Sequence, residues 1–600
     1  MTTTSVPRLD HGVIGNGRVL ALVAPSTDIE WLCLPRFDSP SIFAALLDPV
    51  RGGRFGFESA APVTSRSMRY RTNTNVLRTD VTAEDGQYTI FDFAPWMPGL
   101  LQTHAPLELH RLIVPTGGTP RIRVHFDPRP DYARQNPELV PVAAGVEVQA
   151  GTSRLHLRTN VPVPYVLNNR PIRLDGPVFF TLSWGRPPEA DSVPAVEQAR
   201  DITVRAWRSW VKSCLVPAFA PQAVLRSALC LKLHQSADTG AIIAAATTSI
   251  PEALDSVRTW DYRFCWLRDA AFVVEALRRL SQLAEGEAFV RFLRDVAEDG
   301  PLQPLYGVGG ERMLTEETLD HLSGFAGARP VRIGNAAYMQ QQHDLMGEMV
   351  LCLDTLMTDP RIVDDDQPGL MRLIERLVEH AIAVAPTEDT GIWEYRTQPR
   401  FYTFSQAMCW VAAHRGARLA RMHGLDRQAE RWQTWADEQQ ARVLREAYNV
   451  ERGYFTQALN GTYPDASNLL LATLGFVDPK DPRFVSTVRA YERLLVDRGL
   501  MLRYRHDDDF GETTSAFSIC SFWWVEALAM IGELERAMEL FARLMTHASP
   551  LGLFSEDIDP ATGMLLGNFP QAYTHVGLIH AAITIGELLD ARDGHFRAWA

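Results

Sequence analysis

The chain has 600 residues, of which 46% are hydrophobic and 22% are charged, so its composition is that of a globular protein with roughly two to four domains. Its formal net charge is -13 and its pI is about 5.7, which argues against a nucleic-acid binder, since such proteins need a basic face. A neutral ligand is compatible with this charge.

Cysteine usage and the N-terminal segment indicate a compartment. Seven cysteines are scattered without a CxxC pair, so we expect reduced thiols in a cytoplasmic protein, and no metal site. Residues 1–12 lack the pattern of a signal peptide, and no apolar run is long enough and free of charge to span a membrane. We expect no cofactor, no nucleic-acid partner and no membrane partner, and the oligomeric state stays open.

The first third of the chain has the pattern of short strands. β-rich runs alternate with glycine and proline, as in 19–25, 52–59, 107–116 and 177–185. Their spacing and turn residues predict an antiparallel β-sandwich over residues 1–205, without long charged helices.

From about Phe219 the pattern becomes helical, and we assign residues 206–600 to a second domain. Apolar residues recur at i, i+3, i+4 and i+7. The expected helices are 222–236, 268–285, 339–358, 369–385, 404–424, 426–447, 482–495, 514–531, 534–547 and 573–591. No strand alternates with them, which argues against a βαβ fold. We therefore expect an all-helical toroid that carries its chemistry on one set of loops.

Segment 259–269 is the first candidate for that chemistry. It reads TWDYRFCWLRD and mixes aromatic with charged side chains, among them Trp260, Trp266, Arg268 and Asp269. Aromatic faces and hydroxyl-binding polar groups are what a sugar site needs. The alternative interpretation is that Asp269 caps the helix that follows and that the tryptophans are core residues.

Two further segments offer carboxyl groups. In 391–396 Glu394 stands between Trp393 and Tyr395, and an aromatic wall raises the pKa of a carboxyl, as a general acid requires. The alternative is a surface glutamate with flanking aromatics. In 554–575 Glu556 opens an acidic turn whose alternative is a solvated turn or a calcium loop, although its spacing is not that of an EF-hand.

Two smaller clusters complete the candidates. Gln340 and Asp344 have the i, i+4 spacing of one helical face, where they can hold hydroxyls or pair with each other. Arg503 and Tyr504 are suited to a hydroxyl contact and a stacking contact, and a salt-bridged surface is their alternative. No phosphate-binding loop and no GxSxG elbow is present.

Six segments, in order, resemble glycoside hydrolase family 15, which includes glucoamylases, glucodextranases and bacterial trehalases. They are 14–48, 239–252, 260–270, 327–337, 391–396 and 555–579. The resemblance covers nearly the whole chain. It implies a β-sandwich followed by an (α/α)6 barrel, and cleavage of an α-glucosidic bond with inversion.

The resemblance also implies roles for individual residues. Glu394 matches the general acid and Glu556 the general base. Arg268 and Asp269 match the pair that binds hydroxyls of the non-reducing glucose. Arg503 and Tyr504 resemble the pair near the reducing-side sugar, and Trp393 and Gln571 are further pocket residues. Trp260 and Trp266 of segment 259–269 are also expected to bind the substrate. Asp557 departs from the Glu or Gln of many members.

Several functions stay open at this point. The N-terminal resemblance favours trehalose, whereas maltose, isomaltose and longer α-glucans suit the same scaffold. A phosphorylase of similar architecture, with phosphate as the nucleophile, is the nearest rival. A catalytically silent sugar-binding protein is the rival from another class.

Overall fold

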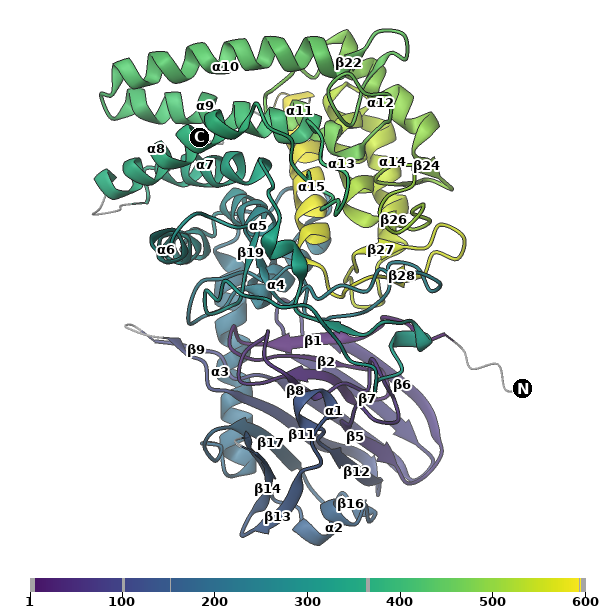
Figure 1. Cartoon of the computed structure of the whole chain (residues 1–600). Helices are drawn as coiled ribbons and strands as arrows, with labels where there is room; N and C mark the ends of the chain where they lie inside the picture. The colour runs from purple at the N-terminus through teal and green to yellow at the C-terminus, as the bar shows by residue number, and fades with distance from the viewer. Residues whose placement is uncertain (1–5, 100–102, 152, 363–366, 593, 595–600) are drawn as a thin grey trace.

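The computed structural model describes residues 6–99, 103–151, 153–362, 367–592 and 594. Strands fill the first part of the chain and helices the second. In Figure 1 the helical part lies above the strands. The predicted order, an antiparallel β domain followed by a helical domain, is confirmed.

Two antiparallel sheets build the first domain. In one sheet the order is β1 (Gly12–Gly15), β2 (Leu20–Val23), β3 (Ile29–Cys33), β5 (Arg54–Ser59), β12 (Arg121–Asp127) and β16 (Ile172–Arg173), with β4 (Ser41–Phe43) beside β3. In the other it is β13 (Glu138–Val142), β14 (Gly145–Ala150), β15 (Ser153–Thr159), β17 (Val178–Trp184), β11 (Glu108–Gly118), β8 (Gly86–Phe93), β7 (Leu77–Ala83) and β6 (Val63–Tyr70). Every strand pair in these sheets is antiparallel.

Alternating burial explains why these segments form a sandwich. Along β7 every second residue is buried, which is the period of a strand with one face on a core. The two inner faces meet through aromatic rings, because Phe57 of β5 lies 5.1 Å from Phe180 of β17 between ring centroids.

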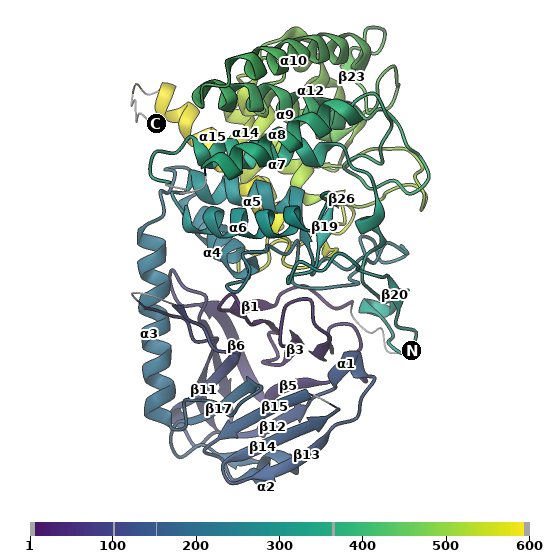
Figure 2. The same cartoon turned by 60° about the vertical axis from the view of Figure 1, so that its left-hand side comes forward.

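A long helix, α3 (Val193–Lys212), follows the last strand and contains residue 205. Figure 2 shows it running along the side of the sandwich towards the helical domain. Our expectation of no long helix before residue 205 was wrong. Proline in the first turn starts the helix, and Trp207 packs against Trp96 with ring centroids 4.2 Å apart.

The second domain is a double ring of helices. Inner helices contact one another in the closed order α5 (Leu267–Arg279), α7 (Asp344–Met357), α9 (Thr403–Met422), η3 with α11 (Ala466–Leu469 and Leu470–Thr473), α13 (Ser518–Met530) and α15 (Ala572–Arg592). Outer helices are α4 (Pro221–His234), α6 (Ala284–Glu298), α8 (Gln367–Val384), α10 (Asp426–Ala447), α12 (Pro482–Leu494) and α14 (Leu534–Met545). This is the predicted (α/α)6 barrel.

Short strands tie the loops before the inner helices together. Strands near the cavity loops are β18 (Cys265–Trp266) with β19 (Leu305–Tyr306), β20 (Glu317–Thr318) with β21 (Arg332–Ile333), and β26 (Ala516–Phe517), β27 (Asp557–Ile558) and β28 (Leu565–Leu566). Others are β22 (Tyr448–Asn449) with β23 (Tyr454–Phe455), and β24 (Val496–Asp497) with β25 (Leu500–Met501). Within the described part of the chain, no helix is long and apolar enough to cross a membrane.

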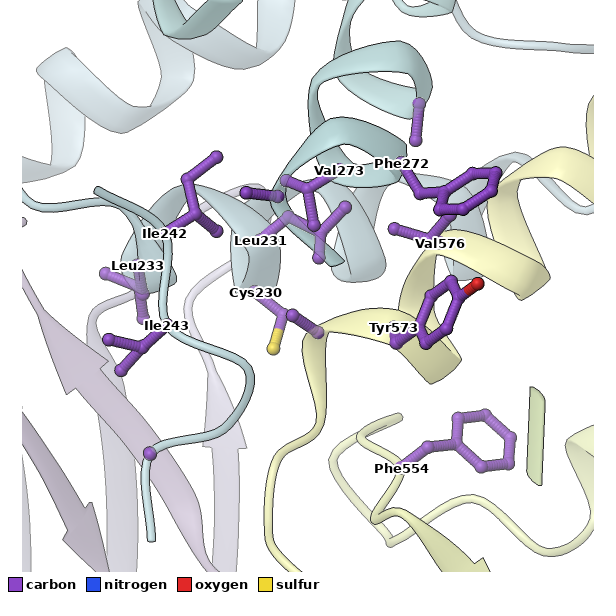
Figure 3. Packing of buried hydrophobic residues seen from close by; sticks show 14 of the residues in the cluster. Cys230, Leu231, Leu233, Ile242, Ile243, Phe272, Val273, Phe554, Tyr573 and Val576 are labelled. Carbon is purple, nitrogen blue, oxygen red and sulfur yellow. The ribbon is translucent and has the colours of Figure 1, made fainter. Parts of the chain in front are cut away.

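Apolar residues of α4, α5 and α15 pack together beneath the loops that precede the inner helices (Figure 3). Leu231 of α4, Val273 of α5 and Val576 of α15 are fully or almost fully buried. Tyr573 stacks on Phe272 with ring centroids 5.5 Å apart. This core fixes the first turns of α5 and α15.

Candidate active site

A cavity opens where the inner helices begin. Its empty volume is about 850 Å³, open solvent at its mouth included. Eight of the ten predicted site residues line it, namely Trp260, Trp266, Arg268, Asp269, Trp393, Glu394, Arg503 and Gln571. The other two, Glu556 and Tyr504, are buried and do not line it.

A tight turn presents Glu394 to the cavity. The Glu394 amide donates to Gly391 O at 3.1 Å, and the Tyr395 amide donates to Thr390 O at 3.1 Å. Glu394 has a φ of 61°, a left-handed conformation that is uncommon outside glycine. Such a conformation costs on the order of 1–3 kcal/mol and is typical of functional sites.

Three donors converge on one oxygen of this carboxyl group. Glu394 Oε1 accepts from Trp266 Nε1 at 2.7 Å, from Gln342 Nε2 at 3.2 Å and from Arg268 at 3.3 Å. Oε2 has no hydrogen-bond partner within the described residues. A proton on this carboxyl group therefore belongs on Oε2.

Arg268 and Asp269 lie in the first turn of α5. Trp266 is the residue at the cap position, so the alternative in which Asp269 caps the helix does not hold. Arg268 donates to Asp344 Oδ2 at 2.9 Å, and its Nε lies 3.9 Å from Asp269 Oδ2. Burial raises the pKa of Asp269 to about 7, with Arg268 opposing and Glu394 adding to the rise.

Glu556 is 1% exposed and is held on the loop between α14 and α15. Its Oε2 accepts the Asn568 amide N–H at 3.2 Å, and its carbonyl accepts the Ser518 amide N–H at 2.8 Å. Oε1 has no partner among the described residues. Burial, followed by the charges of Asp557 and Glu252, raises the pKa of Glu556 well above its ordinary value.

Tyr262 connects Glu556 with the cavity. The Tyr262 side chain lines the cavity wall and interacts with Glu556, lowering the pKa of that carboxyl group against the effect of burial. The charge of Glu394 also acts on Tyr262. Both glutamates therefore lie near the same tyrosine, in different surroundings.

Asp557 is the buried direct neighbour of Glu556. It accepts a hydrogen bond from the Ser515 hydroxyl at 2.8 Å, while its Oδ2 has no partner in the described part of the chain. Burial and the charge of Glu252 raise the pKa of Asp557 to about 7, with Arg503 opposing. Asp557 thus acts on Glu556 by its charge.

Arg503 and Glu252 form a buried ion pair at the cavity wall. Glu252 also accepts from Trp260 Nε1 at 3.1 Å, which orients the indole. Tyr504 lies behind this wall and donates to Asp508 at 2.5 Å. The alternative of a salt-bridged surface does not hold for Arg503, which is 7% exposed.

The remaining predicted residues are fixed by single partners. Trp393 Nε1 donates to both oxygens of the buried Asp465, at 3.0 and 2.9 Å. Gln571 Oε1 accepts from the Thr574 hydroxyl at 2.5 Å, and Gln571 Nε2 has no partner within the described residues.

The prediction that Gln340 and Asp344 share a helical face was wrong. Gln340 follows the short helix η2 (Ala336–Met339) in extended conformation, and α7 begins at Asp344. Gln340 still borders the cavity and donates to the Glu394 carbonyl at 3.0 Å.

Sequence reasoning missed several cavity residues, although Arg396 and Tyr573 lie inside the candidate segments 391–396 and 554–575. They are Glu252, Arg258, Arg396, Asp508, Phe510 and Tyr573. In the described ranges no group of three or more His, Cys, Asp or Glu residues is arranged to hold a metal ion.

Buried polar atoms without partners gather around the cavity. Among the described residues they include Glu556 Oε1, Gln571 Nε2, the Tyr573 hydroxyl and Arg503 Nε. Buried polar atoms are normally paired, so these indicate a ligand or water rich in hydrogen-bonding groups. Two carboxyl groups in unequal surroundings beside aromatic and cationic side chains are the arrangement of a glycoside hydrolase.

The comparisons with known proteins agree with this class. Residues 218–583 match the family model described as "Glycosyl hydrolases family 15", and residues 2–166 match "Trehalase-like, N-terminal". The chain belongs to glycoside hydrolase family 15 and is a glycoside hydrolase.

Named relatives cover almost the whole chain. A trehalase of Mycolicibacterium smegmatis is 38% identical, over 96% of this chain and 91% of the relative. A trehalase of Thermoplasma volcanium is 30% identical, over 98% and 95%. A bacterial glucoamylase solved with acarbose shares the fold, with a TM-score of 0.69 and 14% identity over 100% of this chain and 97% of that structure.

Proposed function

We propose that the chain hydrolyses trehalose with inversion, with Glu394 as general acid and Glu556 as general base. Similarity to relatives that are named trehalases supports the substrate. The observation that carries the chemistry is the pair of unequal carboxyl groups, each with one oxygen that has no partner in the described structure. The seven free thiols also support a cytoplasmic location.

The acid step follows from the contacts of Glu394. Trp266, Gln342 and Arg268 occupy Oε1, so the proton is carried on Oε2. As the glycosidic bond breaks, Oε2 delivers this proton to the bridging oxygen, and the second glucose leaves as a neutral alcohol.

The base step uses Glu556. Its free Oε1 takes a proton from a water molecule that attacks the anomeric carbon from the opposite face. Tyr262 stands between Glu556 and the cavity, in a position to hold this water by its hydroxyl group. Attack on the face opposite the leaving group produces β-glucose.

The buried end of the cavity binds the glucose that is attacked. Arg268 and Asp269 contact its hydroxyl groups, and an ionised Asp269 stabilises the positive charge that develops on the ring. Trp266 and Trp393 supply faces for the ring. On the other side of the cut, Arg503 and Trp260 face the second sugar, and Tyr504 supports that wall from behind.

A substrate panel with two isosteric variants tests this proposal. Glu394→Gln and Glu556→Gln should each lower kcat on trehalose by roughly 10²–10⁴-fold without loss of fold. Glu526→Gln is the matched control, because Glu526 is buried away from the cavity and accepts from Thr584 at 2.8 Å. Near-normal turnover by either site variant would refute the assignment.

The same assays separate the rival functions. Turnover of maltose, isomaltose or soluble starch above that of trehalose would favour a glucoamylase-type enzyme. Glucose 1-phosphate formed only when phosphate is added would favour a phosphorylase. Sugar binding by calorimetry without any turnover would favour a binding protein.

A further inference from the structure

Residues 508–510 form a segment, called here the mouth segment, that links two walls of the cavity. Asp508 accepts from Arg258 at 2.7 and 2.5 Å, which attaches the segment to the loop before α5. Asp509 accepts the amide N–H groups of Arg396 at 2.5 Å and Thr397 at 3.1 Å, which attaches it to the loop of Glu394. The segment therefore joins loops that are far apart in the sequence.

Aromatic and cationic side chains pack together at the mouth segment. The Phe510 ring lies edge-on to Trp260 with centroids 5.1 Å apart. The Arg396 guanidinium lies 4.8 Å from the Trp260 ring centre and 5.4 Å from that of Phe510, and it donates to Glu316 at 3.0 Å. Cation–π contacts and an ion pair thus hold Arg396 against both rings.

The position of Glu394 sets how much space the mouth segment leaves. Arg396 is two residues beyond Glu394, and two residues span at most about 7 Å. The Arg396 amide is bound to Asp509, so the mouth segment is attached to the backbone only two residues from Glu394. With the attacked sugar on the side of Arg268 and Asp269, as proposed above, the second sugar has to fit between Glu394 and the mouth segment.

We propose that the mouth segment is the end wall of the second-sugar site and restricts the enzyme to substrates of two rings. This inference rests on the proposed function, since it takes Glu394 as the point of cleavage. Phe510 blocks the path of a third ring, while the Arg258–Asp508 pair offers its polar atoms to hydroxyl groups of the second.

Rates on matched two-ring and three-ring substrates test the end wall. One pair is trehalose and trehalose carrying one further α-1,4-linked glucose, and the other is maltose and maltotriose. In Phe510→Ala the ratio of kcat/KM for three rings to that for two should rise roughly tenfold, as expected when a steric block is removed. Asp509→Ala, which detaches the segment from Arg396, should raise the ratio in the same direction.

The control is Phe91→Ala. Phe91 is also half-buried and contacted by an arginine, Arg200 at 5.0 Å, but it lies in the sandwich. Its ratio should equal that of the wild type. Circular dichroism establishes that each variant is folded, and calorimetric binding of both sugar lengths to Glu394→Gln, with and without Phe510→Ala, measures the same ratio without turnover.

The outcomes separate the two proposals. An unchanged ratio in folded Phe510→Ala, or a wild type that cleaves three rings as well as two, would overturn the end wall alone. Turnover of neither disaccharide would contradict the proposed function, and the binding ratio would still decide whether the segment limits length.

Discussion

Gly567 lies directly against Glu556: a Cβ atom at position 567 would fall 2.6 Å from Glu556 Cβ and 2.8 Å from Oε2. Gly567 has a φ of 69°, and its amide donates to Pro251 O at 2.8 Å, so its backbone is fixed in place. The missing side chain is therefore a condition for the position of Glu556, the proposed base, because nothing flexible can yield except Glu556 itself.

Gly567→Ala should accordingly lower kcat strongly while it changes the Tm only slightly. A displacement of about 1 Å at a catalytic group costs on the order of 10²-fold in rate. Gly453→Ala is the matched control, because Gly453 has a φ of 72° and open space where a Cβ would lie. Equal kcat values for the two variants, at similar Tm, would show that contact with Glu556 does not matter.

The charge of Asp557 should set the acidic limb of the pH–rate profile. A base works when ionised, so activity is present above the pKa of Glu556 and is lost as the pH falls through it. Asp557 raises the pKa of Glu556, so Asp557→Asn should move the acidic limb of kcat/KM to lower pH. An unmoved limb, or one shifted upwards, would contradict this coupling.

Asp559→Asn provides the control for that shift. Asp559 is on the same loop, but its carboxylate accepts from Ala561 and Thr562 at an exposed turn. Removal of its charge should leave the limb in place, because solvent screens exposed charges.

His575 should make the protein less stable in mild acid. Its Nε2 accepts the Phe554 amide N–H at 3.3 Å, so Nδ1 carries the proton and donates to Ser227 Oγ at 2.9 Å. Burial lowers the pKa of His575 to about 3 from 6.5, with His234 and Arg226 adding to the shift. The stability contributed by the neutral ring is thus complete above pH 6.5 and is lost as the pH falls below it.

The measurement is the difference in unfolding free energy between pH 7 and pH 5. His575 should account for a loss of about 2 kcal/mol over this interval, and His575→Gln should remove that part of the pH dependence. Comparison with the exposed His423→Gln controls for loss of a histidine. If the wild type and His575→Gln lose the same stability, the ring does not act in this way.

Much of the fold could be predicted because its periodicity is local. The outer helix α10, for example, has the bounds 426–447 expected from its apolar spacing. The prediction of one helix over 268–285 failed, since the chain turns at Ser281 with a φ of 63° and then starts α6. Apolar spacing continues across that turn, so the sequence pattern carries little sign of the break.

Some residues of the candidate site could likewise be predicted from the sequence, and others could not. Trp266, Arg268 and Asp269 are close in the sequence and could be found as a cluster. Glu252 could not, because its partner Arg503 is 251 positions away and only the closed ring of helices brings them together. The burial of Glu556 next to Tyr262 likewise depends on two loops that are far apart in the sequence and meet only in the folded barrel domain.

The anomer released from trehalose tests the central claim most directly. Inversion at the attacked carbon produces one β-glucose, while the leaving glucose keeps its own α-configured carbon. Proton NMR during the first moments of hydrolysis should therefore show α- and β-glucose in equal amounts. Initial release of α-glucose alone would mean retention of configuration and would contradict the roles proposed for Glu394 and Glu556.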